Sequence, residues 1–186
     1  MNMTRFQIIQ KFIDTRKFIS FLEIGTYRGE TFKNFNCRIK VSVDPDPEAM
    51  ATHRMTSDKF FEQCADVFDI VFIDGLHEHN QAWRDIKNSL AHLSQGGVIV
   101  MHDCLPTSEK MQEPCSHSRQ GEVWTGDVWK AYTKALWELP YHVYLLDHDW
   151  GCGIIDTAYS RPPVDMDTLK WADFNKSIMN IKNDIA

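Results

Sequence analysis

One apolar segment, Asp69 to Gly75 (DIVFIDG), constrains the fold more than any other part of the chain. Its centre is wholly apolar and rich in β-branched side chains, and an Asp-Gly pair closes it, which is typical of a strand buried on both faces. Similar runs over 18–25, 39–44 and 97–102 alternate with segments of helical spacing. This alternation predicts a doubly wound, Rossmann-like α/β fold, with a mostly parallel sheet and helices on both faces.

We expect about seven strands in total, with three more over 54–58, 141–146 and 152–156. The link between the last two strands covers only about 147–151, whereas a parallel crossover needs a dozen or more residues. The last strand is therefore predicted to be antiparallel.

The length of 186 residues suits one domain with a substantial core. We therefore expect a single domain over 1–186, with its core at about 18–156. The polar segment 105–125 follows a strand end, where it can act as a lid over a cleft. The C-terminal tail, 159–186, is weakly helical in pattern.

Composition excludes several classes of partner. The net charge is −6 and no basic block exceeds two residues, which disfavours nucleic acid. No apolar run approaches the roughly 20 residues of a membrane span, and the first residues lack a signal-peptide core. The five cysteines form no C-x-x-C pair. We expect a cytoplasmic protein with a small-molecule substrate, and a homodimer is one of the oligomeric states left open.

Acidic residues end nearly every predicted strand: Glu23, Asp44, Asp58, Asp74 and Asp103. In open α/β sheets, ligands bind at the carboxyl ends of the strands. A cleft surrounded by carboxylates suits a cationic or hydroxyl-rich ligand and suits a pyrophosphate poorly.

The first strand is followed by a turn with glycines at Gly25 and Gly29. A dinucleotide fingerprint has a further glycine where Tyr27 stands, so the turn argues against nicotinamide and flavin cofactors. Asp44 lies nineteen positions after Gly25, at the end of the second strand, where a carboxylate can accept both ribose hydroxyls. Together these residues predict a nucleoside-type cofactor, although each is also compatible with an ordinary turn.

The chain resembles class I S-adenosylmethionine-dependent methyltransferases over about residues 18–156. The resemblance rests on the turn at 23–29 (EIGTYRG), on Ile-Asp-Gly-x-His at 73–77 and on Gly-Gly-x-x-x-x-His-Asp at 96–103. The last two motifs are typical of a bacterial small-molecule subgroup that is distantly similar to catechol-type O-methyltransferases.

The resemblance implies S-adenosyl-L-methionine as cofactor, which is a net cation and fits acidic strand ends. Glu23 and the two glycines would flank its methionine part, Asp44 its ribose, and Ser57 with Asp58 its adenine. The full set of expected cofactor residues is Glu23, Gly25, Thr26, Tyr27, Gly29, Asp44, Ser57, Asp58 and Asp74.

Candidate catalytic residues stand at two neighbouring strand ends. A hydroxyl acceptor must lose a proton, and histidine suits that task at neutral pH. We expect His102 as the base, Asp103 as its orienting partner and His77 as the second candidate base. A divalent metal held by Asp74 and Asp103, as in catechol-type relatives, is the less favoured alternative.

The sequence thus predicts an enzyme, a methyltransferase acting on a small molecule and specifically on a hydroxyl. A non-catalytic S-adenosylmethionine-binding or regulatory module is the first alternative. A dinucleotide-dependent oxidoreductase is the second, and Tyr27 weakens it. The identity of the acceptor stays open, because the lid and the tail are the least informative parts of the sequence.

Overall fold

The computed structural model describes residues 2–113, 123–161 and 181–182. None of the helices in these ranges is long and apolar enough to cross a membrane. The elements, in chain order, are α1 (Arg5–Arg16), β1 (Ser20–Ile24), β2 (Ile39–Val43), α2 (Ser57–Gln63), β3 (Phe68–Ile73), α3 (His79–Ala91), β4 (Leu93–Met101), the 3₁₀ helix η1 (Glu109–Gln112), α4 (Val128–Glu138), β5 (Tyr141–Leu146), β6 (Cys152–Ser160) and β7 (Ile181–Lys182).

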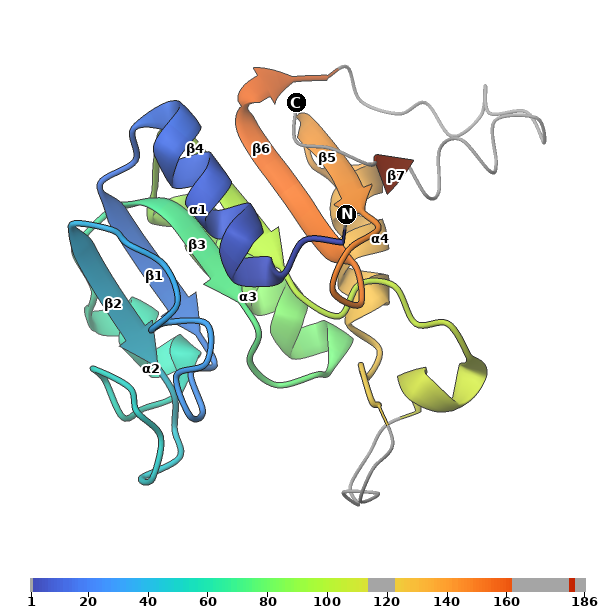
Figure 1. Ribbon diagram of the computed structural model, residues 1–186, viewed down its shortest axis with the longest axis horizontal. Coiled ribbons are helices and arrows are strands. Elements are labelled where there is room, and N and C mark those ends of the chain that lie inside the picture. The colour runs from blue at the N-terminus through green and yellow to red at the C-terminus, as the bar shows by residue number, and fades with distance from the viewer. Residues whose placement is uncertain (1, 114–122, 162–180, 183–186) are drawn as a thin grey trace.

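The strands form one sheet in the order β2-β1-β3-β4-β6-β5-β7, so the predicted fold class is confirmed. Strands β1 to β4 are parallel, and Figure 1 shows their arrowheads at one edge of the sheet. Ile24 pairs with Val43 on one side and with Ile73 on the other, and Ile73 pairs with Met101. Because these strand ends are level, the residues that follow them are brought together.

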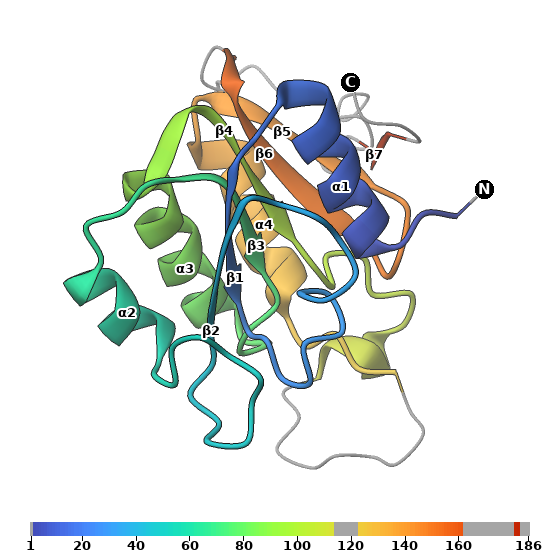
Figure 2. The ribbon, with the colours of Figure 1, turned by 60° about the vertical axis from the view of Figure 1, so that its left-hand side comes forward.

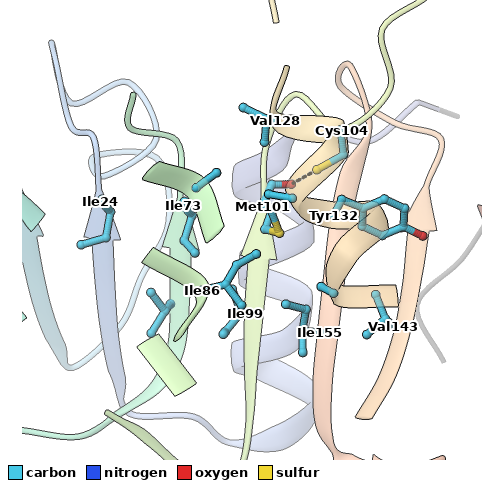
Figure 3. Close-up of a cluster of buried hydrophobic side chains, with 14 of the residues drawn as sticks. Ile24, Ile73, Ile86, Ile99, Met101, Cys104, Val128, Tyr132, Val143 and Ile155 are labelled. Atoms are coloured by element: carbon cyan, nitrogen blue, oxygen red, sulfur yellow. Dashed lines mark hydrogen bonds between the residues drawn. The ribbon is translucent and has the colours of Figure 1, made fainter. Parts of the chain in front are cut away.

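Two apolar clusters cover the two faces of the sheet. On one face, α1 buries Ile8 and Phe12 against Phe72 and Val100 (Figure 2). On the other, α2, α3 and α4 pack over alternate residues of the same strands. Figure 3 shows part of this second cluster, with Ile86 of α3 among side chains of the neighbouring strands. The strands are buried on both sides, which explains their continuous apolar sequence.

The predicted strand over 54–58 is wrong. His53 forms one isolated parallel bridge with Val43, and α2 begins at Ser57. The side chain of Thr56 accepts a hydrogen bond from the backbone N–H of Lys59 at 3.3 Å, which is a helix N-cap. With an acid in the first helical turn and only Met55 apolar before it, this segment carries helix-start signals instead of a strand pattern.

The last long strand, β6, is antiparallel as predicted, but it lies inside the sheet, between β4 and β5. Six strands have five residues or more, and the two-residue β7, which we did not predict, pairs in parallel with β5. The expected lid is described only at its two ends, with η1 in the first. Most of the expected tail lies outside the described residues.

A buried ion pair ties α1 to β6. The guanidinium of Arg16 donates from Nη1 to Asp156 Oδ1 at 2.8 Å and from Nη2 to Asp156 Oδ2. Asp156 is completely buried, and the Arg16 side chain is 17% exposed. Since an unpaired carboxylate at this depth is strongly unfavourable, Arg16 is needed for Asp156 to be charged there.

We predict that Arg16→Met lowers the free energy of unfolding by about 3–5 kcal/mol, because it leaves Asp156 buried without its partner. Chemical denaturation monitored by circular dichroism measures this change. The exposed neighbour Lys17 provides a control, and Lys17→Met should change stability by less than about 1 kcal/mol. A loss of less than about 1 kcal/mol in Arg16→Met would contradict the assignment.

Candidate active site

A cavity of about 630 Å³ opens at the carboxyl ends of β1 to β4. All the predicted site residues except Gly29 line it. Seven carboxylate side chains and two arginines are among its lining residues. These are Glu23, Glu30, Asp44, Asp58, Asp74, Asp85 and Asp103, with Arg5 and Arg28.

Gly25 places the end of β1 directly against the end of β3. A Cβ atom at Gly25 would lie 2.1 Å from the backbone oxygen of Asp74, and the residue has a φ of +86°. Only glycine fits this position. Gly29 also has a positive φ, of +71°, but its open side faces Lys33 and Met50. Gly29 is not among the residues that line the cavity, and its contact with the cofactor stays a prediction.

Asp44 holds the turn after β1 in place. Its Oδ2 accepts hydrogen bonds from the backbone N–H groups of Thr26, at 2.9 Å, and Tyr27, at 2.8 Å. Its Oδ1 accepts one from the backbone of Asp46 at 2.9 Å. Tyr27 has a φ of +45°, and this anchor stabilises a backbone conformation that favours glycine. A carboxylate oxygen has two lone pairs, so Asp44 retains acceptor capacity toward the cavity.

Glu23 is a buried acid without a full set of partners. It is 2% exposed, and its Oε2 accepts no hydrogen bond within the described part of the chain. Burial, and secondly the charge of Asp74, raise the pKa of Glu23 to about 8. The cavity thus contains a carboxyl that a cationic ligand would stabilise in its charged form.

Carboxylates and histidines from three segments of the chain lie close together around Asp74. His102 Nδ1 lies 3.4 Å from Asp74 Oδ1 and 3.3 Å from Asp103 Oδ1, and His102 Nε2 lies 3.6 Å from Asp149 Oδ1. His77 Nε2 lies 3.6 Å from Asp74 Oδ1 and 3.3 Å from Asp103 Oδ2. We refer to these five residues as the Asp-His cluster.

The carboxylates and histidines of the Asp-His cluster shift one another's pKa values. Burial alone would lower the pKa of His102, but the surrounding carboxylates, Asp74 first, raise it well above the ordinary value for histidine. Burial also disfavours the charge on Asp74, yet His102 and His77 lower the pKa of that carboxyl. The raised pKa of His102 favours its protonated form, whereas a general base must be neutral. The role of His102 as base stays a prediction.

The same cluster has the donor set of a cation site. Asp74, His102 and Asp103 each offer one ligand atom, and these atoms lie within 4.8 Å of one another. Two carboxylates and an imidazole suit Mg²⁺ or a transition metal, provided that the imidazole loses its proton. A proton on His102 and a divalent ion are thus two alternative ways to compensate the same carboxylates.

A second polar group lies where α2 and α3 meet the cavity. Ser57 Oγ donates to Asp85 Oδ1 at 2.6 Å, and Gln81 Nε2 donates to the same oxygen at 3.0 Å. Asp58 is more exposed and lies 3.5 Å from Arg84. Ser57 and Asp58 do line the cavity as predicted, but from the first turn of α2 and not from a strand end.

Three residues that matter here were not predicted from the sequence. The Arg5 side chain enters the cavity from α1 and lies 3.9 Å from Asp74, and Asp149 binds the Arg5 backbone at 2.7 Å. Asp85 lies within an amphipathic helix. Arg5 and Asp149 stand in segments without a motif, so only the tertiary structure reveals them. Asp85 carried a weak signal, as an acid on the apolar face of a helix.

We predict that Glu23→Gln flattens the dependence of stability on pH. Since the pKa of Glu23 is higher in the folded than in the unfolded chain, its stabilising contribution is present below about pH 4.5 and is lost as pH rises through 8. Relative to the variant, the wild type should lose about 2–4 kcal/mol of unfolding free energy over this interval. Urea denaturation at half-unit pH steps measures the difference.

The rim residue Glu30 is the matched control, because its side chain is 72% exposed. Glu30→Gln should leave the wild-type profile unchanged. Parallel profiles for the wild type and Glu23→Gln would show that Glu23 is not a raised, buried acid.

The chain is similar to one protein family and to several solved structures. The sequence model of a methyltransferase domain family matches residues 22–104, which run from β1 to just past the end of β4. Among curated proteins no match to the chain was found.

Several solved structures have a similar fold. A methyltransferase from Podospora anserina with bound S-adenosylhomocysteine superposes with a TM-score of 0.64 at 16% identity, covering 84% of this chain and 78% of its own. An O-methyltransferase from Bacillus cereus in complex with S-adenosylhomocysteine gives 0.58 at 13% identity, with 82% and 80% covered. The O-methyltransferase TomG from Streptomyces achromogenes gives 0.58 at 14%, with 82% and 79% covered.

At such identities the likeness to these structures establishes the fold and not the substrate. The matched segment contains the glycine turn, Asp44 and most of the Asp-His cluster. Residues 22–104 are therefore similar to a methyltransferase domain family, and the chain shares the fold of these solved methyltransferases, as the resemblance predicted.

Proposed function

We propose that this protein transfers the methyl group of S-adenosylmethionine to a hydroxyl of a small molecule. The observation that carries the proposal is the buried carboxyl of Glu23, which faces an acidic cavity with an oxygen that lacks a hydrogen bond in the described structure. Such a group favours a ligand with an ammonium and a sulfonium charge over a pyrophosphate. The solved relatives that contain S-adenosylhomocysteine or S-adenosylmethionine support the same cofactor.

The cavity residues suit the separate parts of this cofactor. Glu23 would bind the ammonium group, and its charge would then be stabilised. Asp44 has one remaining lone pair, on Oδ1, for a ribose hydroxyl. Ser57 and its neighbours on α2 and α3 would face the remaining part of the cofactor, the adenine base. When bound, the cofactor supplies an activated methyl group, and the protein mainly positions the acceptor in line with it.

The Asp-His cluster is the proposed acceptor side. We expect Asp74 and Asp103 to accept a hydrogen bond from the acceptor hydroxyl. One of these carboxylates would take up the hydroxyl proton as the oxygen bonds to the methyl carbon and S-adenosylhomocysteine leaves. Asp103 has a φ of +59°, a strained conformation of the kind found at functional sites. His102 and His77 would hold these carboxylates in place as cations. The earlier assignment of His102 as base thus becomes a proposed positioning role, with His77 beside it.

We also propose that the protein is cytoplasmic and that its acceptor is a small molecule. The described cysteines, Cys37, Cys64, Cys104 and Cys152, are free thiols, which suits the reducing cytoplasm. The cavity volume of about 630 Å³ must hold the cofactor as well as part of the acceptor. A small molecule fits this space better than a macromolecule.

The direct test incubates the protein with S-adenosylmethionine and a panel of hydroxylated small molecules, and measures S-adenosylhomocysteine and methylated product by mass spectrometry. The proposal predicts both products in equal amounts for at least one acceptor. If the protein binds S-adenosylhomocysteine but no acceptor in a broad panel is methylated, a binding module is the better description.

We predict that Asp44→Ala weakens binding of S-adenosylhomocysteine by about 1–3 kcal/mol, which is roughly a 5- to 150-fold rise in Kd. The loss has two sources, the ribose hydrogen bond and the anchor of the turn at Thr26 and Tyr27. Isothermal titration calorimetry measures it. Asp46→Ala is the control, because the exposed Asp46 donates only its backbone N–H to Asp44. An unchanged Kd in Asp44→Ala would refute the ribose assignment.

We also predict that chelation with EDTA leaves methyl transfer intact. His102 Nδ1 lies 3.4 Å from Asp74 and 3.3 Å from Asp103, so a protonated His102 would compensate both carboxylates without a divalent ion. The initial rate of S-adenosylhomocysteine formation, with and without chelator, is the measurement. If the rate falls and Mg²⁺ restores it, a metal held by Asp74, His102 and Asp103 activates the acceptor instead.

A further inference from the structure

Asp85 is the most deeply buried carboxylate that lines the cavity. It lies on α3, is 1% exposed, and still contributes to the cavity wall. The proposed function gives this residue no task. A buried carboxylate without a counter-ion is unfavourable, so its presence calls for a physical reason.

The hydrogen bonds of Asp85 are one-sided. Both side-chain donors that reach it, Ser57 Oγ at 2.6 Å and Gln81 Nε2 at 3.0 Å, bind the same oxygen, Oδ1. Across the described ranges, no hydrogen bond or ion pair reaches Oδ2, and the one nearby guanidinium, of Arg84, lies against Asp58 instead. Burial raises the pKa of Asp85 to about 6. One oxygen is thus held in position while the other remains available to a donor in the cavity.

The position of Asp85 selects the part of the ligand that it can meet. Ser57 stands on α2 and Gln81 and Asp85 on α3, whereas the Asp-His cluster follows the ends of β3 and β4 and includes the loop between β5 and β6. Figure 2 shows α2 and α3 together on one side of the sheet. With the charged end of the cofactor at Glu23 and the ribose at Asp44, the base is left for the α2 and α3 side.

We propose that Asp85, oriented by Ser57 and Gln81, selects the base of the cofactor by accepting a hydrogen bond from the exocyclic amine of adenine. This inference rests on the proposed use of S-adenosylmethionine. An amine presents a donor to Oδ2, whereas a carbonyl at the same ring position, as in hypoxanthine, presents a second acceptor. Two buried acceptors that face each other leave both groups unpaired, so the site should reject the hypoxanthine analogue.

The test compares S-adenosylhomocysteine with S-inosylhomocysteine, in which a carbonyl replaces the exocyclic amine and the adjacent ring nitrogen gains a hydrogen. Titration calorimetry at pH 8, above the pKa of Asp85, measures both affinities. For the wild type we expect S-adenosylhomocysteine to bind about 10- to 100-fold more tightly. Asp85→Asn can present either an amide oxygen or an amide N–H, so its preference should fall to within about threefold. Glu62→Gln changes an exposed acid of α2 that does not line the cavity, and it should keep the wild-type preference.

The outcomes separate this inference from the proposed function. If the wild type binds S-adenosylhomocysteine and S-inosylhomocysteine equally, the role of Asp85 is refuted while cofactor binding stands, and this result needs no variant to fold. A wild-type preference that Asp85→Asn retains, with an unchanged circular dichroism spectrum, also refutes it. If the wild type binds neither ligand, the proposed function fails first. A preference lost in Asp85→Asn and kept in Glu62→Gln supports the inference.

Discussion

The level ends of three parallel strands are the constraint on which this site depends. Because β1, β3 and β4 are paired in register, the residues after Ile24, Ile73 and Met101 meet at one edge of the sheet. Gly25 permits the closest of these approaches, since any side chain there would collide with the backbone of Asp74. The apolar strands thus create a place where several acids must lie close together.

Such a concentration of carboxylates is unfavourable unless positive charge balances it. Arg5 from α1 supplies part of that charge. The neighbouring carboxylates also raise the pKa of His102 and of His77, which favours the charged form of both histidines. At Glu23 the protein supplies too little, and the acid holds its proton at neutral pH. The carboxylates of the Asp-His cluster therefore have positive groups beside them, whereas at Glu23 the positive charge is insufficient. A cofactor that carries its own positive charge near the reacting methyl group would supply the charge that Glu23 lacks.

Much of this fold follows from local sequence. The apolar run that includes Ile70 and Phe72 is a central strand as predicted, and the short link before β6 correctly indicated an antiparallel strand. The strand predicted around Ser57 was wrong, because Thr56 caps the N-terminus of a helix there and the strand pattern is weak. The position of β6 inside the sheet could not be predicted, since strand order is set by packing between distant segments.

The candidate site was predictable to the extent that it follows strand ends. Glu23, Asp44 and Asp74 line the cavity because parallel strands place their carboxyl ends at one edge. The raised pKa of His102 was predictable only in part. Asp74 and Asp103 contribute most of the carboxylate effect and follow strand ends, whereas Asp149 approaches from the loop between β5 and β6. The role of Asp85 also depends on tertiary structure, because it arises from burial of this carboxylate against Ser57.

The most direct test of the central claim is a crystal structure of the protein grown with S-adenosylhomocysteine. The account predicts electron density in the cavity at the ends of β1 to β4, with the amino group at Glu23, the ribose at Asp44 and the sulfur facing the Asp-His cluster. An empty cavity at saturating ligand, or density for the ligand elsewhere on the molecule, would contradict the account.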